Sequence, residues 1–150
     1  MGNAANTQFA VAVHAMTLLS AAPEIKQSSE ILAGSIGSNP VHVRRVMAHL
    51  RDAGLVESRP GVGGGWRVLK SPEDTTLAEI WRAVRGDGRV LGVHATNPDC
   101  AVGRRIQLEM EAIDEQAVRA VEGALEKVTI DELVADSNAV EQHLSRPLPA

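Results

Sequence analysis

A cluster of glycines in the middle of the chain is the strongest constraint on its fold. The stretch RPGVGGGWRV, from Arg59 to Val68, holds four glycines within five residues. Glycine loses more backbone entropy on folding than any other residue, so the cluster predicts a place that needs positive φ angles or close backbone approach. Three structures have that need: a phosphate-binding loop, a flexible linker and the tip of a tight hairpin.

The flanking residues favour the hairpin. A P-loop requires a Gly-Lys-Ser/Thr triplet at the start of a helix, and this sequence lacks that triplet. A dinucleotide-binding loop also leads into a helix, whereas the segment WRVL that follows favours a strand. A linker would not lead at once into Trp and alternating apolar residues. We therefore predict two short strands, in LVESR and WRVLK, with either a ligand-binding or a purely structural tip.

Two helices separated by a short turn precede this hairpin. The first follows an N-cap at Ser28 or Ser29, and Gly37 supplies the turn. The second begins with Pro40 in its first turn and runs over residues 40–53. Its apolar residues fall on one face: Val43, Val46, Met47 and Leu50. This is a helix-turn-helix pattern, and the hairpin behind it adds a wing.

Further helices flank the winged helix-turn-helix. Residues 7–20 are apolar on nearly every side and predict a buried helix, in which His14 is expected to be a partly buried core residue rather than a ligand. Thr76 and Glu79 form a capping box that starts another helix, with Trp81 in the core. The predicted fold is therefore mainly α, with one small β-hairpin.

A long helix is predicted over residues 103–128. Its small and apolar residues recur at alternating steps of four and three, as in a heptad seam: Ile106, Met110, Ile113, Ala117, Ala120 and Ala124. The helix would be about 39 Å long, which is too long for so small a domain to cover. A second copy of the same helix would cover the seam and form a symmetric dimer. Packing within one chain is the alternative.

Charge is distributed unevenly along the chain. The net charge is −4, but residues 38–70 carry six basic and two acidic side chains, whereas residues 103–150 carry five basic and ten acidic ones. A polyanion responds to the local charge rather than the sum. The basic middle predicts double-stranded DNA as the partner. The acidic remainder supports an alternative, a winged-helix module that binds other proteins.

Other functional classes find little support in the sequence. No stretch is apolar enough to span a membrane and no signal peptide is visible, so a cytoplasmic protein is expected. No catalytic triad, paired-carboxylate pocket or metal-ligand cluster is apparent, so we expect no enzymatic activity, no metal and no cofactor. The single cysteine, Cys100, is expected at the start of the long helix, where a thiolate is favoured. It is either a redox sensor or an ordinary small residue.

The order of these features resembles the Rrf-type family of bacterial transcription regulators. The resemblance rests on the helix-turn-helix, on LRDAGLV, on the wing RPGVGGGWRV and on SPEDTTLAEIWRAVRG, followed by a loop and the long helix. It implies a homodimeric repressor or regulator that reads a palindromic operator. Some members hold an iron–sulfur cluster on three cysteines in that loop. Because Cys100 stands alone here, the chain looks closer to the cluster-free, YwnA-like branch.

This interpretation assigns residues to each role. Residues 1–88 form the DNA-binding domain, 89–102 a sensor-like loop, 103–136 the dimerisation helix with a short C-terminal helix, and 137–150 a flexible tail. The second helix of the helix-turn-helix would enter the major groove and the wing would contact the flanking backbone. The residues predicted to contact DNA are Ser28, Ser29, Ser38, Asn39, Val41, His42, Arg44, Arg45, Arg59, Gly63, Gly64 and Arg67.

Overall fold

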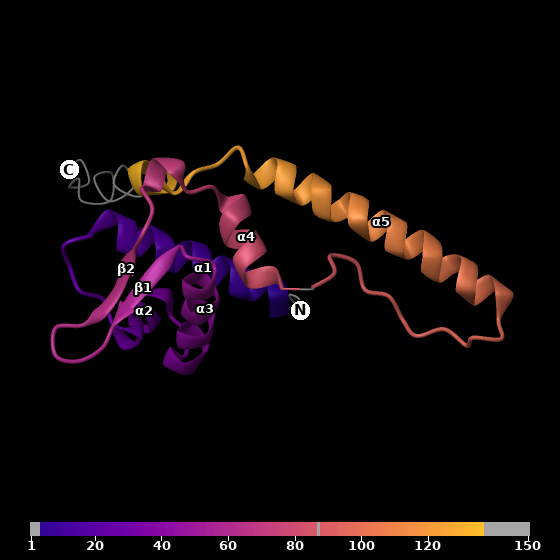
Figure 1. Cartoon of the computed structure of the whole chain (residues 1–150), viewed down its shortest axis with the longest axis horizontal. Coiled ribbons are helices and arrows are strands. Elements are labelled where there is room, and N and C mark those ends of the chain that lie inside the picture. Colours follow the sequence, from indigo (N-terminus) through magenta and orange to yellow (C-terminus); the bar gives the residue numbers. More distant parts are fainter. Residues whose placement is uncertain (1–3, 87, 137–150) are drawn as a thin grey trace, which may run out of the picture.

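The computed structural model describes residues 4–86 and 88–136, which form a mainly helical fold with one two-stranded antiparallel sheet, as predicted (Figure 1). The flexible tail predicted for residues 137–150 lies outside the described residues. In chain order the elements are α1 (Ala4–Ala21), α2 (Ser29–Ile36), α3 (Pro40–Asp52), β1 (Val56–Arg59), β2 (Gly65–Val68), a 3-10 helix (Pro72–Asp74), α4 (Leu77–Arg85) and α5 (Ala101–Leu125).

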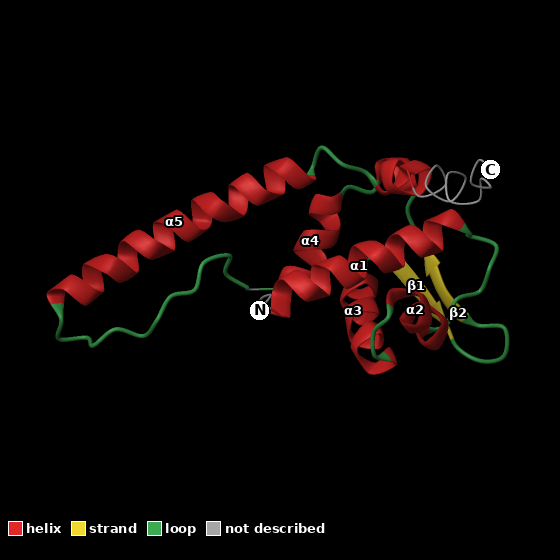
Figure 2. Ribbon diagram, turned by 180° about the vertical axis from the view of Figure 1, so that it is seen from behind, coloured by secondary structure: helices red, strands yellow, loops and turns green. Residues whose placement is uncertain are grey.

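Helices α1 to α4 and the hairpin pack together into a unit that we call the head, while α5 extends away from it (Figure 2). The head has one apolar core, and its largest fully buried side chains include Met16, Leu32, Met47, Leu50 and Ile80. Trp81 is buried as predicted, and its ring meets that of Phe9 edge-on with the centroids 5.3 Å apart. His14 is exposed, contrary to the prediction, because α1 turns only one face toward the core.

Local side-chain caps define where the helices begin. Ser28 caps α2 by accepting a hydrogen bond from the Ile31 N–H, and Asn39 caps α3 in the same way through the Val41 N–H. The capping box predicted at α4 is present, with Thr76 and Glu79 each satisfying the other's backbone N–H. These caps stabilise helices too short to be stable alone.

The glycine cluster is required by the hairpin itself. Strands β1 and β2 pair from Val56 opposite Val68 to Arg59 opposite Gly65. At the tip, Gly63 has a φ of 80°. A Cβ on Gly64 would lie 2.0 Å from the carbonyl oxygen of Arg59, so no other residue fits there without moving the backbone. The glycines thus permit a tight turn and close packing inside the protein.

Replacing Gly64 with Ala is therefore expected to destabilise the protein by more than about 1 kcal/mol, because the hairpin must open to admit the methyl group. Urea unfolding followed by circular dichroism measures this change. Gly34→Ala is the matched control: it lies in α2 with free space around it, and Ala there is expected to stabilise by roughly 0.5–1 kcal/mol. Equal unfolding midpoints for Gly64→Ala and the unmodified protein would contradict the expectation.

A loop runs back along α5 before that helix begins (Figure 1). The Leu91 N–H donates a hydrogen bond to the Asp114 carboxylate at 2.6 Å, and the Thr96 hydroxyl donates to the Gln107 side chain. At the other end of α5, Arg82 of α4 forms ion pairs with Glu122 and Glu126 at 3.4 and 2.6 Å. One face of α5 is thus held by the chain's own loop and by α4.

After α5 the chain returns to the head. The Leu77 N–H donates to the Val128 carbonyl and the Ile130 N–H to the Thr75 carbonyl, and Ile130 is fully buried in the core. The described residues 130–136 are helical, and the Glu132 N–H donates to the Thr129 hydroxyl. Ile130, Leu133 and Val134 pack in or against the core of the head. The grouping of this short helix with the dimerisation helix stays a prediction.

Candidate nucleic-acid interface

Helix α3 has one buried and one exposed face. Its four apolar core residues are fully buried, whereas Val41, Arg44 and Arg45 are exposed. Val41 is 60% exposed at the start of the helix, next to the exposed cap residue Asn39. Ser38 and His42 are half-buried. The exposed face of α3 therefore offers an apolar group, amide and hydroxyl groups and two guanidinium groups to a partner.

The two adjacent arginines of α3 differ in their surroundings. Arg44 donates to the Glu30 carboxylate at 2.7 Å. The backbone N–H of Glu30, the Ser28 hydroxyl and Arg44 itself hold the pKa of that carboxyl below its usual value, so the ion pair is present at neutral pH. Arg45 has no ion-pair or hydrogen-bond partner within residues 4–86 and 88–136. Its guanidinium is thus the one free to meet a new acceptor.

A groove brings the helix-turn-helix and the wing together. It encloses about 360 Å³ between the start of α2, the Arg44 side chain and the arms of the hairpin, and its lining includes Ser28, Arg59 and Gly64. These residues come from three separate parts of the sequence. The fold thus gathers several of the predicted contact residues along one continuous surface.

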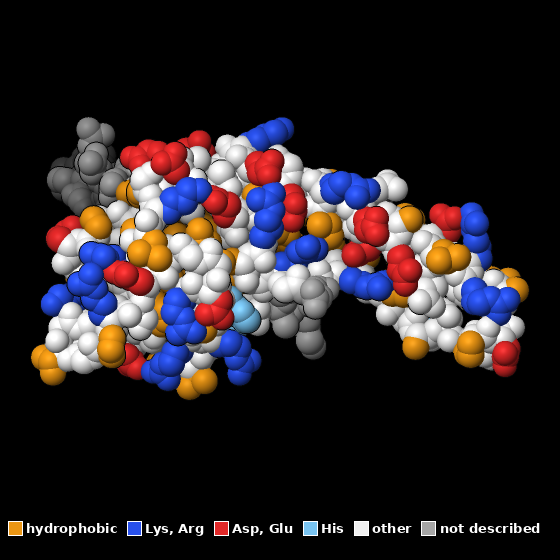
Figure 3. All heavy atoms as spheres, viewed as in Figure 1, with side chains coloured by type: hydrophobic (Ala, Val, Ile, Leu, Met, Phe, Trp, Pro, Cys, Tyr) orange, Lys and Arg blue, Asp and Glu red, His pale blue; other side chains and the backbone are white. Residues whose placement is uncertain are grey.

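Both wing arginines lie beside a single carboxylate. Glu57 on β1 is 3.5 Å from Arg59 and 2.5 Å from Arg67, and both guanidinium groups remain exposed. Two positive charges and one negative charge leave a surplus of one positive charge at the hairpin. In the space-filling view, Lys and Arg side chains gather on the head, whereas basic and acidic side chains alternate along α5 (Figure 3).

Ser29 has a structural role that the sequence analysis missed. Its side chain is buried, and its hydroxyl accepts a hydrogen bond from the Trp66 indole N–H at 2.9 Å. The Trp66 backbone N–H also donates to the Gln27 carbonyl, so the chain before α2 pairs with the edge of β2. The Ser29 hydroxyl therefore joins the wing to α2, and Ser29 also lines the groove beside the wing.

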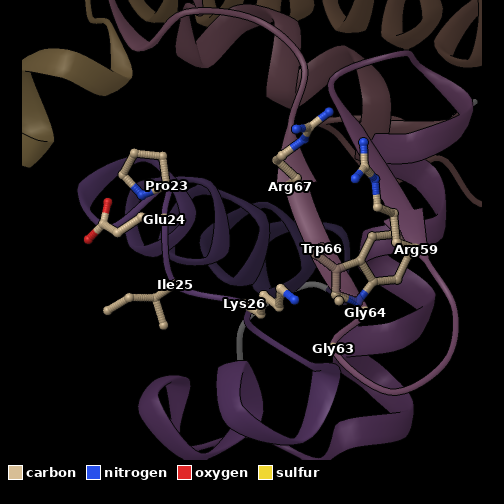
Figure 4. Close-up of a pocket in the computed structure, with 10 residues that line it drawn as sticks. Pro23, Glu24, Ile25, Lys26, Arg59, Gly63, Gly64, Trp66 and Arg67 are labelled. Atoms are coloured by element: carbon tan, nitrogen blue, oxygen red, sulfur yellow. The ribbon is translucent and has the colours of Figure 1, made fainter.

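A second hollow lies beside the wing (Figure 4). It encloses about 230 Å³ between residues 23–26 and the hairpin. The exposed Lys26 lines it together with Arg59, Gly63 and Arg67. Lys26 was absent from the predicted contact residues because a single lysine in a turn carries no sequence signal.

The predicted dimer seam follows an uncovered stripe on α5. Each of Ile106, Met110 and Ile113 precedes by one position a residue bound by the loop, namely Gln107, Glu111 and Asp114. One position on an α-helix is a rotation of about 100°, so the stripe lies beside the covered face. Ile106 and Ile113 are each 46% exposed. Ala117 is half-buried, and Ala120 and Ala124 are exposed.

Cys100 caps the start of α5. Its side chain is exposed, and its sulfur accepts a hydrogen bond from the Gly103 N–H at 3.3 Å. The predicted position at the beginning of the long helix is confirmed, with the helix starting at Ala101 rather than Gly103. The proposed redox sensing by Cys100 stays a prediction.

A helix-turn-helix with a basic exposed face and a hairpin behind it defines a winged-helix DNA-binding protein. Residues 5–136 match the family Rrf2, described as an iron-dependent transcriptional regulator. The chain belongs to this family and is a DNA-binding transcription regulator, not an enzyme. Within the described residues, no helix has the length and apolar character to cross a membrane.

Individual relatives agree with this assignment. YwnA of Bacillus subtilis, named as a candidate HTH-type transcriptional regulator, is 38% identical over 130 residues, which are 86% of this chain and 96% of YwnA. NsrR of the same organism is 28% identical over 116 residues, with 77% and 76% of the two chains covered. A crystal structure described as a candidate DNA-binding protein is 35% identical, with a TM-score of 0.67 over 84% of this chain and 97% of its own.

The family description mentions iron, but the side chains of this chain do not fit an iron–sulfur cluster. Such clusters are usually held by four cysteine thiolates, and the sequence contains one cysteine. Within the part of the chain that the structure describes, no three His, Cys, Asp or Glu residues are grouped as a metal site. The residues of this chain therefore do not supply the ligand set of an iron–sulfur cluster.

Proposed function

We propose that two copies of this chain bind one palindromic DNA operator and repress transcription from it. The groove shared by the start of α2, Arg44 and the wing carries this proposal, because it aligns hydroxyl, guanidinium and backbone groups on one surface. A dimer bound there would exclude other proteins from the same base pairs.

The exposed face of α3 would enter the major groove with its N-terminal end first. Asn39, Val41 and Arg45 would face the bases, with Ser38 and His42 beside them. A free guanidinium such as that of Arg45 can form a bidentate contact with the O6 and N7 atoms of guanine. Arg44 is oriented by Glu30 and would contact a phosphate at the edge of the groove.

The wing would lie on the neighbouring backbone. Arg59 and Arg67 supply positive charge, and the glycine tip at Gly63 and Gly64 allows the backbone to approach closely. The Ser28 hydroxyl at the start of α2 would contact a phosphate oxygen. The Ser29 hydroxyl accepts the Trp66 indole N–H, keeps its own O–H as a donor, and would lie beside Ser28 at the groove.

The exposed stripe on α5 supports dimerisation. A stripe of exposed isoleucines beside a covered face is costly to leave in water, and a second α5 would bury it. The two α3 helices of such a dimer would need to lie about 34 Å apart to read half-sites one helical turn apart. Residues 1–88 would then be the reading unit and α5 the dimerisation element.

Replacing Arg59 with Gln tests the wing contact. We expect weaker binding to every duplex alike, and a decrease of about 1.8 in the steepness of log K against log salt, because each of the two subunits loses one phosphate contact. Fluorescence anisotropy with an operator selected from random DNA and with an unrelated duplex measures both. An unchanged slope would contradict the wing contact. If the DNA affinity of the unmodified protein does not depend on salt, a protein-interaction module is favoured instead.

A further inference from the structure

Lys26 lies against the tip of the wing although it comes from the connection between α1 and α2. Its Nζ atom is 2.8 Å from the point where a Cβ on Gly63 would stand, so a side chain at that position would displace the ammonium group. Figure 4 shows the Lys26 side chain reaching toward the Gly63–Gly64 end of the hairpin. The packing thus places a positive charge beside the wing tip.

The charge of Lys26 is uncompensated within the described residues. No carboxylate there forms an ion pair or hydrogen bond with its ammonium group, whereas Arg59 and Arg67 share Glu57. Glu24 lines the same hollow, but its carboxylate points away from Lys26 (Figure 4). An anion that enters on the Lys26 side therefore meets a cation without having to break an existing pair.

The groove beside Arg44 and this second hollow both border the hairpin. Arg59, Gly64, Gly65 and Trp66 contribute to both, while Ser28 and Arg44 line only one hollow and Lys26 only the other. A DNA strand that follows the groove would meet Ser28 and Arg44. A phosphate in the second hollow would meet Lys26 instead.

We propose that Lys26 binds a phosphodiester of the DNA backbone in this second hollow, in addition to the backbone contacts proposed at the groove. This inference rests on the DNA-binding mode proposed above and adds a contact that lies outside the helix-turn-helix and the hairpin. The recognition chemistry, an ammonium group facing a phosphate oxygen, would also suit a free phosphate or a phosphorylated small molecule. The test below separates these sources.

The first arm compares Lys26→Gln with Arg51→Gln in salt titrations on the selected operator and on a random duplex. Arg51 is the matched control, because it is an exposed cation of the same head that is already paired with Asp52 at 3.1 Å. Because the dimer carries two copies of Lys26, Lys26→Gln is expected to lower the steepness of the salt dependence by about 1.8 on both duplexes. Arg51→Gln is expected to leave the slope unchanged. Equal slopes for the two variants would overturn the proposal.

The second arm locates the contact. Operators with a single methylphosphonate replace one charged phosphate at a time by a neutral group. At one backbone position, the unmodified protein is expected to lose affinity and Lys26→Gln to lose none. If no position shows this difference, Lys26 does not bind the backbone.

The third arm tests free phosphate. The melting temperatures of the unmodified protein and of Lys26→Gln are measured without DNA, in phosphate and in chloride at equal ionic strength. Phosphate is expected to raise neither melting temperature. Stabilisation by phosphate that vanishes in Lys26→Gln, with unchanged DNA slopes, would overturn the proposal in favour of a small-anion site. If Arg59→Gln acts as expected and Lys26→Gln does not, only this inference fails. If both leave DNA binding unchanged, the proposed wing contact fails as well.

Discussion

Replacing Ile113 with Glu is expected to convert the protein to a monomer and to weaken operator binding by at least about 100-fold. Ile113 lies at the middle of the exposed stripe on α5 and is 46% exposed in the single chain. In the proposed dimer a glutamate at this position would be buried opposite its own symmetry mate, as an unpaired charge. A monomer binds each half-site independently, whereas linking two binding modules typically raises the affinity by a factor of 10² to 10⁴.

Leu108→Glu is the matched control for this substitution. Leu108 is also an exposed aliphatic residue of α5, at 63%, but it lies on the side of the helix away from the predicted seam. We expect Leu108→Glu to remain a dimer with unchanged DNA affinity. Sedimentation velocity gives the oligomeric state and fluorescence anisotropy the affinity. A dimeric Ile113→Glu variant, or a dimer that Leu108→Glu breaks equally well, would show that the stripe is not the interface.

Replacing Arg45 with Ala is expected to weaken operator binding by roughly 5- to 150-fold, or about 1–3 kcal/mol, and to relax base preference at one position of each half-site. Arg45 is exposed on α3 and has no partner among the described residues, so its guanidinium is available to a base edge. The loss should be large on the selected operator and small on random DNA, because a base contact is made only with the correct sequence.

Arg44→Ala separates a base contact from a phosphate contact on the same helix. Arg44 is held by Glu30, and its loss is expected to weaken operator and random duplex by similar factors. Selection of binding sites from random DNA, followed by anisotropy on single-base variants, measures both effects. If Arg45→Ala keeps its base preference, Arg45 does not contact a base. If Arg44→Ala relaxes the base preference instead, Arg44 makes the base contact.

Much of the local structure follows from residues close together in the chain. Ser28 and the pair Thr76–Glu79 cap their helices through backbone groups three residues away, so the short-range pattern was enough to predict them. The apolar spacing of α3 and the hairpin around the glycines are local in the same sense. The order of these elements was also enough to indicate the family, and the family assignment is confirmed.

The details of the interface depend on contacts between distant segments. The hydrogen bond from Trp66 to Ser29 joins residues 37 positions apart and gives a residue predicted to contact DNA a second role in holding the wing. The pair of Arg44 with Glu30 distinguishes two neighbouring arginines that look alike in the sequence. The position of Lys26 beside Gly63 and the burial of Ile130 in the head were equally invisible to local patterns.

The sequence by itself determined the helix starts, the winged helix-turn-helix order and the uneven charge, because neighbouring side chains and backbone groups decide these properties. Only the tertiary structure decided which charged groups are already paired and which hydroxyl is buried. It also placed the Arg59 carbonyl oxygen so close to residue 64 that only glycine fits there. These depend on through-space distances of a few ångströms between segments that are far apart in the chain, and burial and ion pairing change steeply over such distances.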